Sequence, residues 1–400
     1  MDQSLGTMRR WSMLGIALFA TLFANVFING VAFRIPTLHN DFGLDLARAG
    51  LISAMPKFGM VPTLIAWGYV VDRAGERFVL WVGSALTAAA ALAAALSDSL
   101  PAMAILLFLG GMAAASSNSA SGRLVVGWFP AEQRGLAMGI RQTAQPLGVG
   151  LGALVMPQIA HSYGTGAALL FPAAVCAVAA VLCAIAAIDP PRPARSEAPT
   201  ADLANPYRAS KALWRIHAAS VLLVVPQAVV WTFALVWLMS ERGWSPAAAG
   251  ALVTATQILG ALGRIAAGRW SDRIGARLRP IRIIAASAAA SMVLLALTDS
   301  PGSSWSIAAL IVASVVTVSD NALAFTAIAE IAGPFWSGRA LGAQNTSQLL
   351  AAGLTPPLFG ALIGAAGYPV AFAVCALFPV LAIPMVPVDA DENGSPTTAL

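Results

Sequence analysis

Two ionisable side chains, Lys57 and Asp320, stand inside long apolar stretches of this chain. A charged group in the interior of a bilayer costs on the order of 2.5 to 3.5 kcal/mol, so it faces a protein interior or a water-filled cavity instead of lipid. An ammonium group in such a place needs an anion from the substrate or from the protein. A buried carboxyl group can carry a proton, because burial favours its neutral form and a nearby cation its charged form. Lys57 therefore predicts an anion-binding site, and Asp320 a proton-coupling group.

A structural alternative stays open for both residues. Lys57 and Asp320 can pair with each other, or Asp320 can neutralise a cation without any role in coupling. Lys57 lies about ten residues, or roughly 15 Å, from the outer end of its predicted helix, near the midplane where substrate sites of transporters lie. Its position therefore favours contact with a substrate.

Further polar side chains occur in matched pairs about 200 residues apart along the chain. The pairs are Lys57 with Gln257, Asn118 with Asn321, Arg141 with Gln344, and Gln142 with Asn345. In two pairs the first half carries a cation where the second carries a neutral amide. We expect these residues, together with Asn29, to bind the substrate, and the excess of positive charge in a low-dielectric pocket to favour a small anion.

Other arginines and aromatic residues have two interpretations each. Arg141 can line a cavity or form a cytoplasmic gate. Arg123 can reach the inner surface or brace the loop around Asp72, and Arg34 can attract anions at the outer side or anchor its helix at the interface. Arg264 and Glu330 fall near predicted cytoplasmic helix ends, which favours a structural role. Aromatic residues can line a pocket or only pack, as for Phe27, Trp231 and Phe325.

The scaffold that positions these residues is duplicated. The segment 68–77, GYVVDRAGER, returns as 268–277, GRWSDRIGAR, with Gly, Asp, Arg, Gly and Arg at identical spacing. Each copy connects two apolar segments of membrane length. The pattern resembles the signature loop between the second and third helices of the major facilitator superfamily of secondary transporters.

The resemblance implies twelve transmembrane helices in two pseudo-symmetric six-helix bundles around a central cavity. In each loop a glycine permits close helix approach, and an aspartate faces the positive N-terminus of a neighbouring helix. We expect these loops to form a latch; the alternative is a tight cytoplasmic turn with positive flanks. The latch residues are Gly68, Asp72, Arg73, Arg77, Arg123, Gly268, Asp272, Arg273 and Arg277.

Composition independently places the chain in a membrane. It is 58% hydrophobic and 10% charged, against roughly 25% charged in soluble domains. Each crossing needs about 20 apolar residues, so 400 residues accommodate about twelve helices with short loops. Every third predicted helix is apolar across its span, apart from basic residues at the cytoplasmic start of the ninth. This pattern predicts that these helices face lipid and that the others enclose polar groups.

The order of apolar and polar segments divides the chain into four parts. We expect a first bundle at 1–188, a cytoplasmic linker at 189–212, a second bundle at 213–388 and a cytoplasmic tail at 389–400. The predicted helices span about 11–35, 47–71, 78–96, 101–128, 135–160, 165–188, 213–240, 246–268, 281–298, 304–332, 340–364 and 367–388.

Basic residues concentrate in the loops assigned to the cytoplasm, while Arg48 and Arg242 fall outside. Both termini are then cytoplasmic, and we expect a multi-pass monomer of the cell inner (plasma) membrane. The +5 net charge belongs to these loops and does not indicate nucleic acid. Scattered cysteines, histidines and acids, without a nucleotide-binding loop, predict no metal, no cofactor and no enzymatic activity.

These features predict a secondary transporter that moves a small organic anion, such as a carboxylate, by alternating access with proton symport. Drug or metabolite efflux is the first alternative, although Gln145–Gly148 lacks the Gly-Pro pair frequent in helix 5 of such exporters. A nitrate porter would need Asn- and Gly-rich helices 5 and 11. A non-transporting sensor on the same scaffold would need an added soluble domain or long loop.

Overall fold

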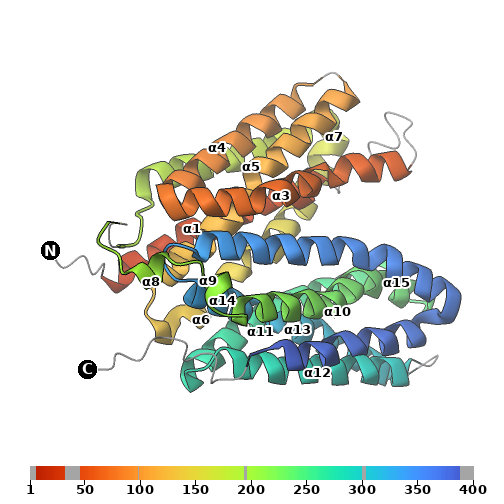
Figure 1. Ribbon diagram of the computed structural model, residues 1–400. Helices are drawn as coiled ribbons and strands as arrows, with labels where there is room; N and C mark the ends of the chain where they lie inside the picture. Colours follow the sequence, from red (N-terminus) through yellow and green to blue (C-terminus); the bar gives the residue numbers. More distant parts are fainter. Residues whose placement is uncertain (1–5, 32–45, 98, 193–195, 300–302, 388–400) are drawn as a thin grey trace. The chain divides into compact units, whose positions relative to one another are not determined.

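Regular structure in the described part of the chain is helical throughout (Figure 1). The computed structural model describes residues 6–31, 46–97, 99–192, 196–299 and 303–387. Contacts divide the chain into two compact units. The first comprises Met1–Pro130, Thr143–Leu203 and Ala332–Thr346, and the second comprises Ala131–Gln142, Ala204–Ile331 and Ser347–Leu400. Each unit thus includes a short segment from the other half of the sequence.

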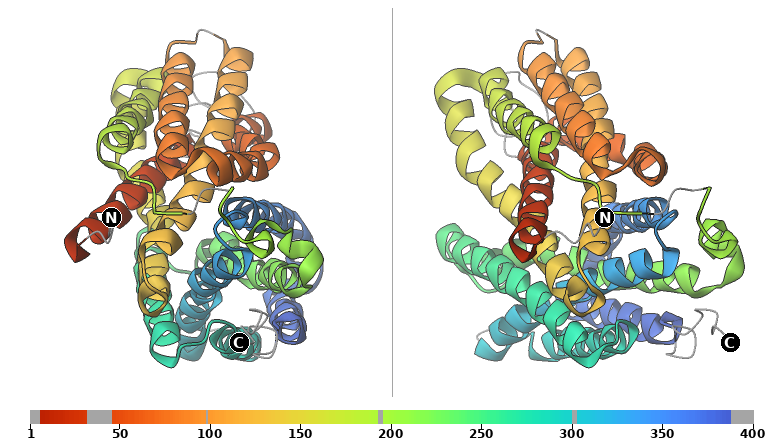
Figure 2. Two further views of the ribbon diagram at one scale, coloured as in Figure 1. Left: turned by 60° about the vertical axis from the view of Figure 1, so that its left-hand side comes forward. Right: turned by 90° about the vertical axis from the view of Figure 1, so that its left-hand side faces the viewer.

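The first unit is a bundle of long helices. They are α1 (Thr7–Gly30), α3 (Leu46–Ala74), α4 (Glu76–Ala95), α5 (Leu100–Trp128) and α7 (Ala144–Ala186). Helix α3 packs against α5, α1 packs against α7, and α4 packs against both α5 and α7, as the two views in Figure 2 show. The short α8 (Thr200–Leu203) and the first residues of α15 (Ser337–Ala382) complete the described part of this unit.

The second unit is also a bundle of long helices. Its helices are α6 (Ala131–Gln142), α9 (Pro206–Ala209), α10 (Ala212–Ser240), α11 (Pro246–Ile274), α12 (Leu278–Thr298), α13 (Ser304–Ser319), α14 (Asn321–Ala332), most of α15, and the 3-10 turn η2 (Ile383–Met385). Helix α6 packs against α11, while α10, α11 and α12 pack against α13. Buried apolar residues such as Trp237, Met292, Leu310 and Phe372 form a continuous core.

Helix starts and bends follow from local sequence. Ser99 and Ser245 cap α5 and α11 by accepting a hydrogen bond from the backbone N–H three residues on, at 3.3 Å in each case. Gly164 and Gly367 bend α7 and α15 with nearly the same backbone angles, φ 87° and ψ 168° against φ 82° and ψ 169°. Positive φ favours glycine, so the duplicated halves share these turns between consecutive spans.

Ten helical segments of the described residues are long and apolar enough to cross a bilayer. Helix α15 counts once among them, although Gly367 divides it into two spans. The fifth predicted span is not among the ten; α6 and the part of α7 before Gly164 occupy its place in the chain. Adding these two spans gives twelve, so the expectation of an all-α integral membrane fold is confirmed.

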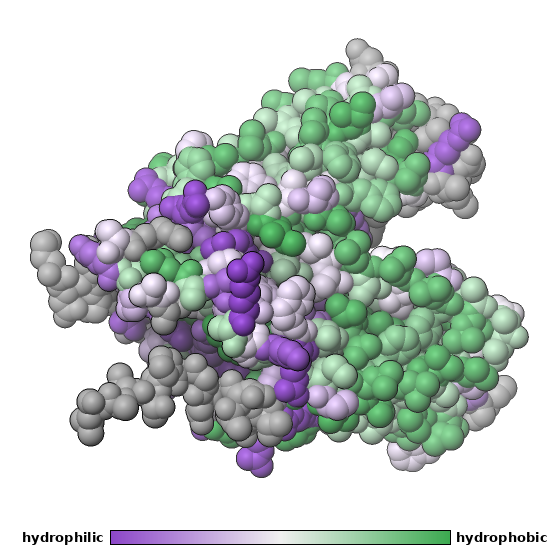
Figure 3. Space-filling model, viewed as in Figure 1, coloured by the Kyte–Doolittle hydropathy of each residue, from purple (hydrophilic) through white to green (hydrophobic). Residues whose placement is uncertain are grey.

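Large apolar side chains point outward from the third, sixth, ninth and twelfth spans. Examples are Trp81 on α4, Ile185 on α7, Leu297 on α12 and Leu377 on α15. On the face in Figure 3, hydrophobic residues cover α12 and the neighbouring length of α15, while hydrophilic residues gather near α9. These spans are the ones that we expect to face lipid.

Candidate functional site

Lys57 lies on α3 immediately after Pro56, in the part of the helix that packs against α5. A Cβ on Gly111 of α5 would collide with the Pro56 backbone, so glycine is what lets the two helices approach here. The Lys57 side chain is exposed and makes no hydrogen bond or ion pair with a described residue of its own unit. Within this unit, its charge remains available to a bound anion.

The first unit, which contains Lys57, also contains predicted substrate-binding amide side chains from three helices. Asn29 donates to the Asn25 Oδ1 atom at 3.2 Å along α1, and Asn118 is half-buried on α5. The first turns of α15 add the fully buried Gln344 and the half-buried Asn345, whose amide donates to the Leu341 carbonyl at 2.8 Å. Five of the predicted substrate-binding residues thus belong to one unit.

The partners of these residues in the sequence repeat belong to the second unit. Arg141 on α6 is only 2% exposed, donates to the Gln142 Oε1 atom at 2.9 Å, and places its guanidinium carbon 5.8 Å from the Phe325 ring centroid. Gln257 is half-buried on α11. The cation of the Arg141–Gln344 pair therefore belongs to the second unit and its amide to the first. Lys57 and Arg141, which share the first half of the sequence, thus belong to different units.

A chain of two buried amides and one half-buried amide links three helices of the second unit. Asn321 at the start of α14 donates to the Gln227 Oε1 atom on α10 at 2.9 Å, and it accepts from the Gln348 amide on α15 at 3.1 Å. Asn321 was predicted from the sequence, whereas the other two residues were missed. Gln227 is an isolated amide in an apolar helix. Gln348 ends the polar run 344–348, and the offset of 203 residues that relates Arg141 to Gln344 also relates Gln145 to Gln348, so the pairing rule could have selected it.

Asp320 lies at the junction of α13 and α14, beside a second buried charge that sequence reasoning undervalued. Arg264 on α11 is 2% exposed and Asp320 is 3% exposed, and their charges interact. The expectation that Arg264 sits near a helix end is wrong, because α11 continues to Ile274. Arg264 is therefore about 15 Å inside the helix, at 1.5 Å per residue.

The Arg264 side chain has no hydrogen-bond acceptor among the described residues. Its guanidinium carbon lies 5.8 Å from the Trp231 ring centroid, and no direct ion pair with Asp320 is formed. A buried polar group without a hydrogen bond costs about 1–3 kcal/mol. An arginine held in this way is suited to receive an anionic ligand, since guanidinium binds carboxylates through paired hydrogen bonds.

The first loop aspartate binds the start of α15. Asp72 accepts hydrogen bonds from the backbone N–H groups of Gly338 at 2.8 Å and Arg339 at 3.2 Å, and from the Arg339 Nε atom at 2.9 Å. A Cβ on Gly68 would collide with the Gly338 backbone. The carboxylate thus meets the positive end of a helix across a glycine contact.

The second loop repeats this contact with α6. Asp272 accepts from the backbone N–H groups of Gly135 at 2.9 Å and Leu136 at 2.7 Å. A Cβ on Gly268 would collide with Gly135. Both loops therefore place a glycine and an aspartate against the beginning of another helix of the same unit.

Arginines around the two loops have separate partners. Arg123 on α5 pairs with Glu76 and lies 3.7 Å from Asp72, and Arg77 donates to the Ala184 carbonyl. Arg73 lies 4.5 Å from the Tyr69 ring centroid, and Arg273 is exposed. The predicted position of Arg34 lies outside the described residues.

Arg277 connects the second loop to α14. It contacts Asp272 at 2.7 Å and Glu330 at 3.2 Å, and Arg134 also contacts Glu330 at 3.3 Å. Burial alone would lower the pKa of Arg277, but the carboxylates of Glu330 and Asp272 raise it overall. The guanidinium therefore stays charged and holds the loop to α14.

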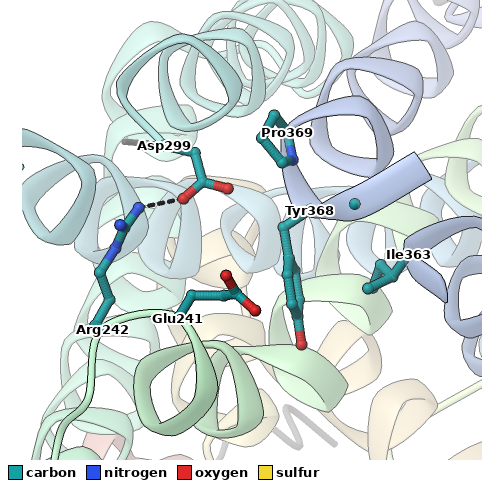
Figure 4. A pocket seen from close by; sticks show the side chains of 7 residues that line it. Glu241, Arg242, Asp299, Ile363, Tyr368 and Pro369 are labelled. Atoms are coloured by element: carbon teal, nitrogen blue, oxygen red, sulfur yellow. Dashed lines mark hydrogen bonds and ion pairs between the residues drawn. The ribbon is translucent and has the colours of Figure 1, made fainter. Parts of the chain in front are cut away.

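A separate cavity of about 220 Å³ lies at the C-terminal end of α10 in the second unit (Figure 4). Its charged lining residues are Glu241, Arg242 and Asp299. Arg242 pairs with Asp299, which also accepts from the Trp237 indole N–H at 3.1 Å. Burial raises the pKa of Asp299, and Arg242 opposes the increase. Because its cation is already neutralised, this cavity is a weaker candidate for an anion site than Arg264.

Comparison with known proteins decides the family. A model of the major facilitator superfamily matches residues 14–356 and 227–398. An uncharacterized MFS-type transporter of Mycobacterium tuberculosis (strain ATCC 25618 / H37Rv) is 56% identical over 394 residues, which cover 98% of this chain and 88% of the relative. The chain belongs to the major facilitator superfamily. The resemblance carried by the two loops is thereby confirmed.

More distant members of the superfamily share the fold. The "Probable galactarate/D-glucarate transporter" of Bacillus subtilis (strain 168) is 22% identical over 369 residues, covering 83% of this chain and 80% of the relative. The solved structure of the proton:xylose symporter XylE bound to 6-bromo-6-deoxy-D-glucose has a TM-score of 0.77 at 18% identity, covering 96% of this chain and 97% of that chain. This protein is therefore a multi-pass membrane transporter of the superfamily.

Proposed function

We propose that this protein is a secondary transporter that moves a small organic carboxylate together with a proton by alternating access. The observation that carries the proposal is the presence of deep cations without a direct carboxylate partner in their own unit, Lys57 in the first and Arg264 in the second. A carboxylate substrate supplies the missing anion. The name of the Bacillus subtilis relative, which refers to the sugar diacids galactarate and D-glucarate, supports the same substrate class.

Lys57 binds the substrate in this proposal, assisted by amides that donate hydrogen bonds to hydroxyl or carboxylate oxygens. The amides and the further cation are Asn29, Asn118, Arg141, Gln142, Gln257, Asn321, Gln344 and Asn345. Asp320 carries the proton, because a buried carboxyl group near a cation changes its protonation when the local charge changes.

The two loops with their aspartates and glycines act as latches whose contacts break and reform during the cycle. The protein works as a monomer in the inner (plasma) membrane with both termini in the cytoplasm, and its action is transport without enzymatic conversion of the substrate.

Uptake into proteoliposomes tests this function. Purified protein is reconstituted with an inward proton gradient, and uptake of radiolabelled D-glucarate is compared with uptake of xylose and of a cationic dye. We expect gradient-driven accumulation of D-glucarate and none of the other two. Accumulation of the dye, with D-glucarate excluded, would instead support the efflux alternative.

Two variants assign the roles. Lys57→Gln removes the ammonium and should abolish D-glucarate uptake while leaving the protein folded, as judged by circular dichroism and gel filtration. Asp320→Asn should retain exchange of external for internal D-glucarate but lose accumulation driven by the proton gradient. Wild-type uptake in the first variant, or accumulation in the second, would contradict these assignments.

A further inference from the structure

Arg264 is a buried guanidinium to which the described residues offer no hydrogen-bond acceptor. It carries five N–H donors in a planar fork, and its exposed fraction is 2%. The side chain makes neither a hydrogen bond nor an ion pair with the part of the chain that is described. Its guanidinium carbon lies 5.8 Å from the centroid of the Trp231 ring. The Arg264 nitrogens are not among the fully enclosed polar atoms without a partner in the described residues, so they still face open space from which an anion can reach them.

The neighbouring acid is close enough to act on Arg264 without bonding to it. Asp320 is also buried, and its charge interacts with that of Arg264. The carboxylate is not within ion-pair distance. Arg264 is therefore attracted to Asp320 but still has its donors available for a second carboxylate.

The described contacts of Arg264 and of Asn321, the residue after Asp320, are otherwise made with neutral side chains. Trp231 on α10 lies beside Arg264, and Gln227 on α10 and Gln348 on α15 bind Asn321. From α6, Arg141 lies over Phe325, on the α14 helix that begins just after Asp320. Among the described residues, Arg264 is the charged group that acts on Asp320, while burial has the larger influence. An anion that engages Arg264 therefore changes the charge that acts on Asp320.

We infer that Arg264 binds the carboxylate of the substrate in the second unit, and that Asp320 takes up one proton for each carboxylate bound there. This inference rests on the proposed carboxylate transport. When Asp320 is ionised, its carboxylate is the counter-ion of Arg264. When a proton from solution binds the Asp320 oxygen, the substrate carboxylate becomes the counter-ion of Arg264 instead. The net charge around Arg264 is the same before and after, so anion and proton enter the site together.

Calorimetric titration of the purified protein with D-glucarate tests the inference. Titration in two buffers of different ionisation enthalpy measures how many protons are taken up per anion bound. We expect about one proton for the wild type and about none for Asp320→Asn. Wild-type affinity should fall about tenfold per pH unit once Asp320 is ionised in the free protein, whereas the affinity of Asp320→Asn should be independent of pH.

Arg264→Gln should weaken D-glucarate binding by about 10- to 100-fold, the usual range for loss of a charge-assisted hydrogen-bond pair. Arg264→Lys keeps the charge without the planar fork and should bind with intermediate affinity. The matched control is Arg279→Gln, an exposed arginine at the start of α12, which should bind as the wild type does. If Arg264→Gln fails to fold, the proton count in Asp320→Asn and the affinity of Arg264→Lys still decide the question.

The outcomes separate this inference from the proposed function. The inference is overturned if Arg264→Gln binds D-glucarate with the same affinity as the wild type, or if Asp320→Asn still takes up a proton on binding. Either result leaves carboxylate transport intact. Absence of D-glucarate binding and uptake in the wild type overturns both.

Discussion

In both copies of the ten-residue loop, the aspartate accepts hydrogen bonds from backbone N–H groups of a neighbouring helix. The charged side chain that a further helix supplies to the loop is a cation in one copy and an acid in the other. In the 68–77 copy, the neighbouring helix α5 supplies a cation, Arg123, to the acids Asp72 and Glu76. In the 268–277 copy, the neighbouring helix α14 supplies an acid, Glu330, to Arg277. The contact that both copies share is made by backbone N–H groups and a glycine, whereas the contact that differs is made between side chains.

The two networks also differ in exposure. The side chains of Arg123 and Glu76 are 5% and 0% exposed, while those of Arg134 and Glu330 are 28% and 22% exposed. A buried ion pair is costly to break because it leaves a charge without a partner, and a solvated pair contributes little. The second loop also has a largely buried pair, Arg277 and Asp272, at 11% and 6% exposure. The comparison teaches that solvent reaches the outer part of the second network, at Arg134 and Glu330, but not the pair Arg123 and Glu76 of the first.

The largest expected effect is loss of the buried cation. Arg123→Ala leaves Glu76 and Asp72 buried beside it without that cation, and should lower the free energy of unfolding by about 3–5 kcal/mol. Equilibrium unfolding in detergent measures the change. The matched control, Arg134→Ala in the second network, should cost about 1 kcal/mol or less. Equal losses in the two variants would show that burial does not distinguish the loops.

An intermediate effect is expected where the copies agree. Gly68→Ala and Gly268→Ala each place a Cβ against the backbone of Gly338 or Gly135. Overpacking of this kind costs about 1–3 kcal/mol, and the two costs should match because the contact is the same. Thermal unfolding of both variants measures this, with Gly250→Ala, which has open space around it, as the control. A large difference between Gly68→Ala and Gly268→Ala would contradict an equivalent latch.

The smallest effect is expected in the solvated network. Glu330→Gln removes one carboxylate from Arg277, which retains Asp272 at 2.7 Å. The loss should be about 0.2–1 kcal/mol and should shrink further in high salt. Unfolding at low and high ionic strength provides the measurement. A loss above about 3 kcal/mol would mean that this pair behaves as a buried one.

Prediction from the sequence was strongest for features that depend only on the composition of a segment or on the spacing of residues along the chain. The lengths and composition of the apolar segments indicate membrane spans, because a bilayer requires about 20 apolar residues per crossing. The repeated loop indicates the superfamily through the spacing of its residues alone, and both expectations are confirmed. The substrate-binding roles of Lys57 and its amide partners remain predictions.

Helix length explains the main error at the candidate site. Arg264 was placed near a helix end because the second loop was expected to begin at Gly268, yet Gly268 to Ile274 continue α11. Glycine often ends a helix, and here Gly275, in the left-handed conformation with φ 63°, is the glycine that does so. Arg264 therefore lies in the interior of α11 and is buried, as Asp320 is.

The sequence by itself determined the class of this protein, its twelve spans and the duplicated loops, since each depends on composition or on spacing along the chain. Only the tertiary structure decided that Arg141 lies over Phe325, that Gln227 and Gln348 join Asn321, and that Arg264 faces Asp320 without a bond. Membrane-spanning helices are apolar on most of their circumference, so their sequence does not reveal which face turns inward. That rotation is set by packing against the neighbouring helices.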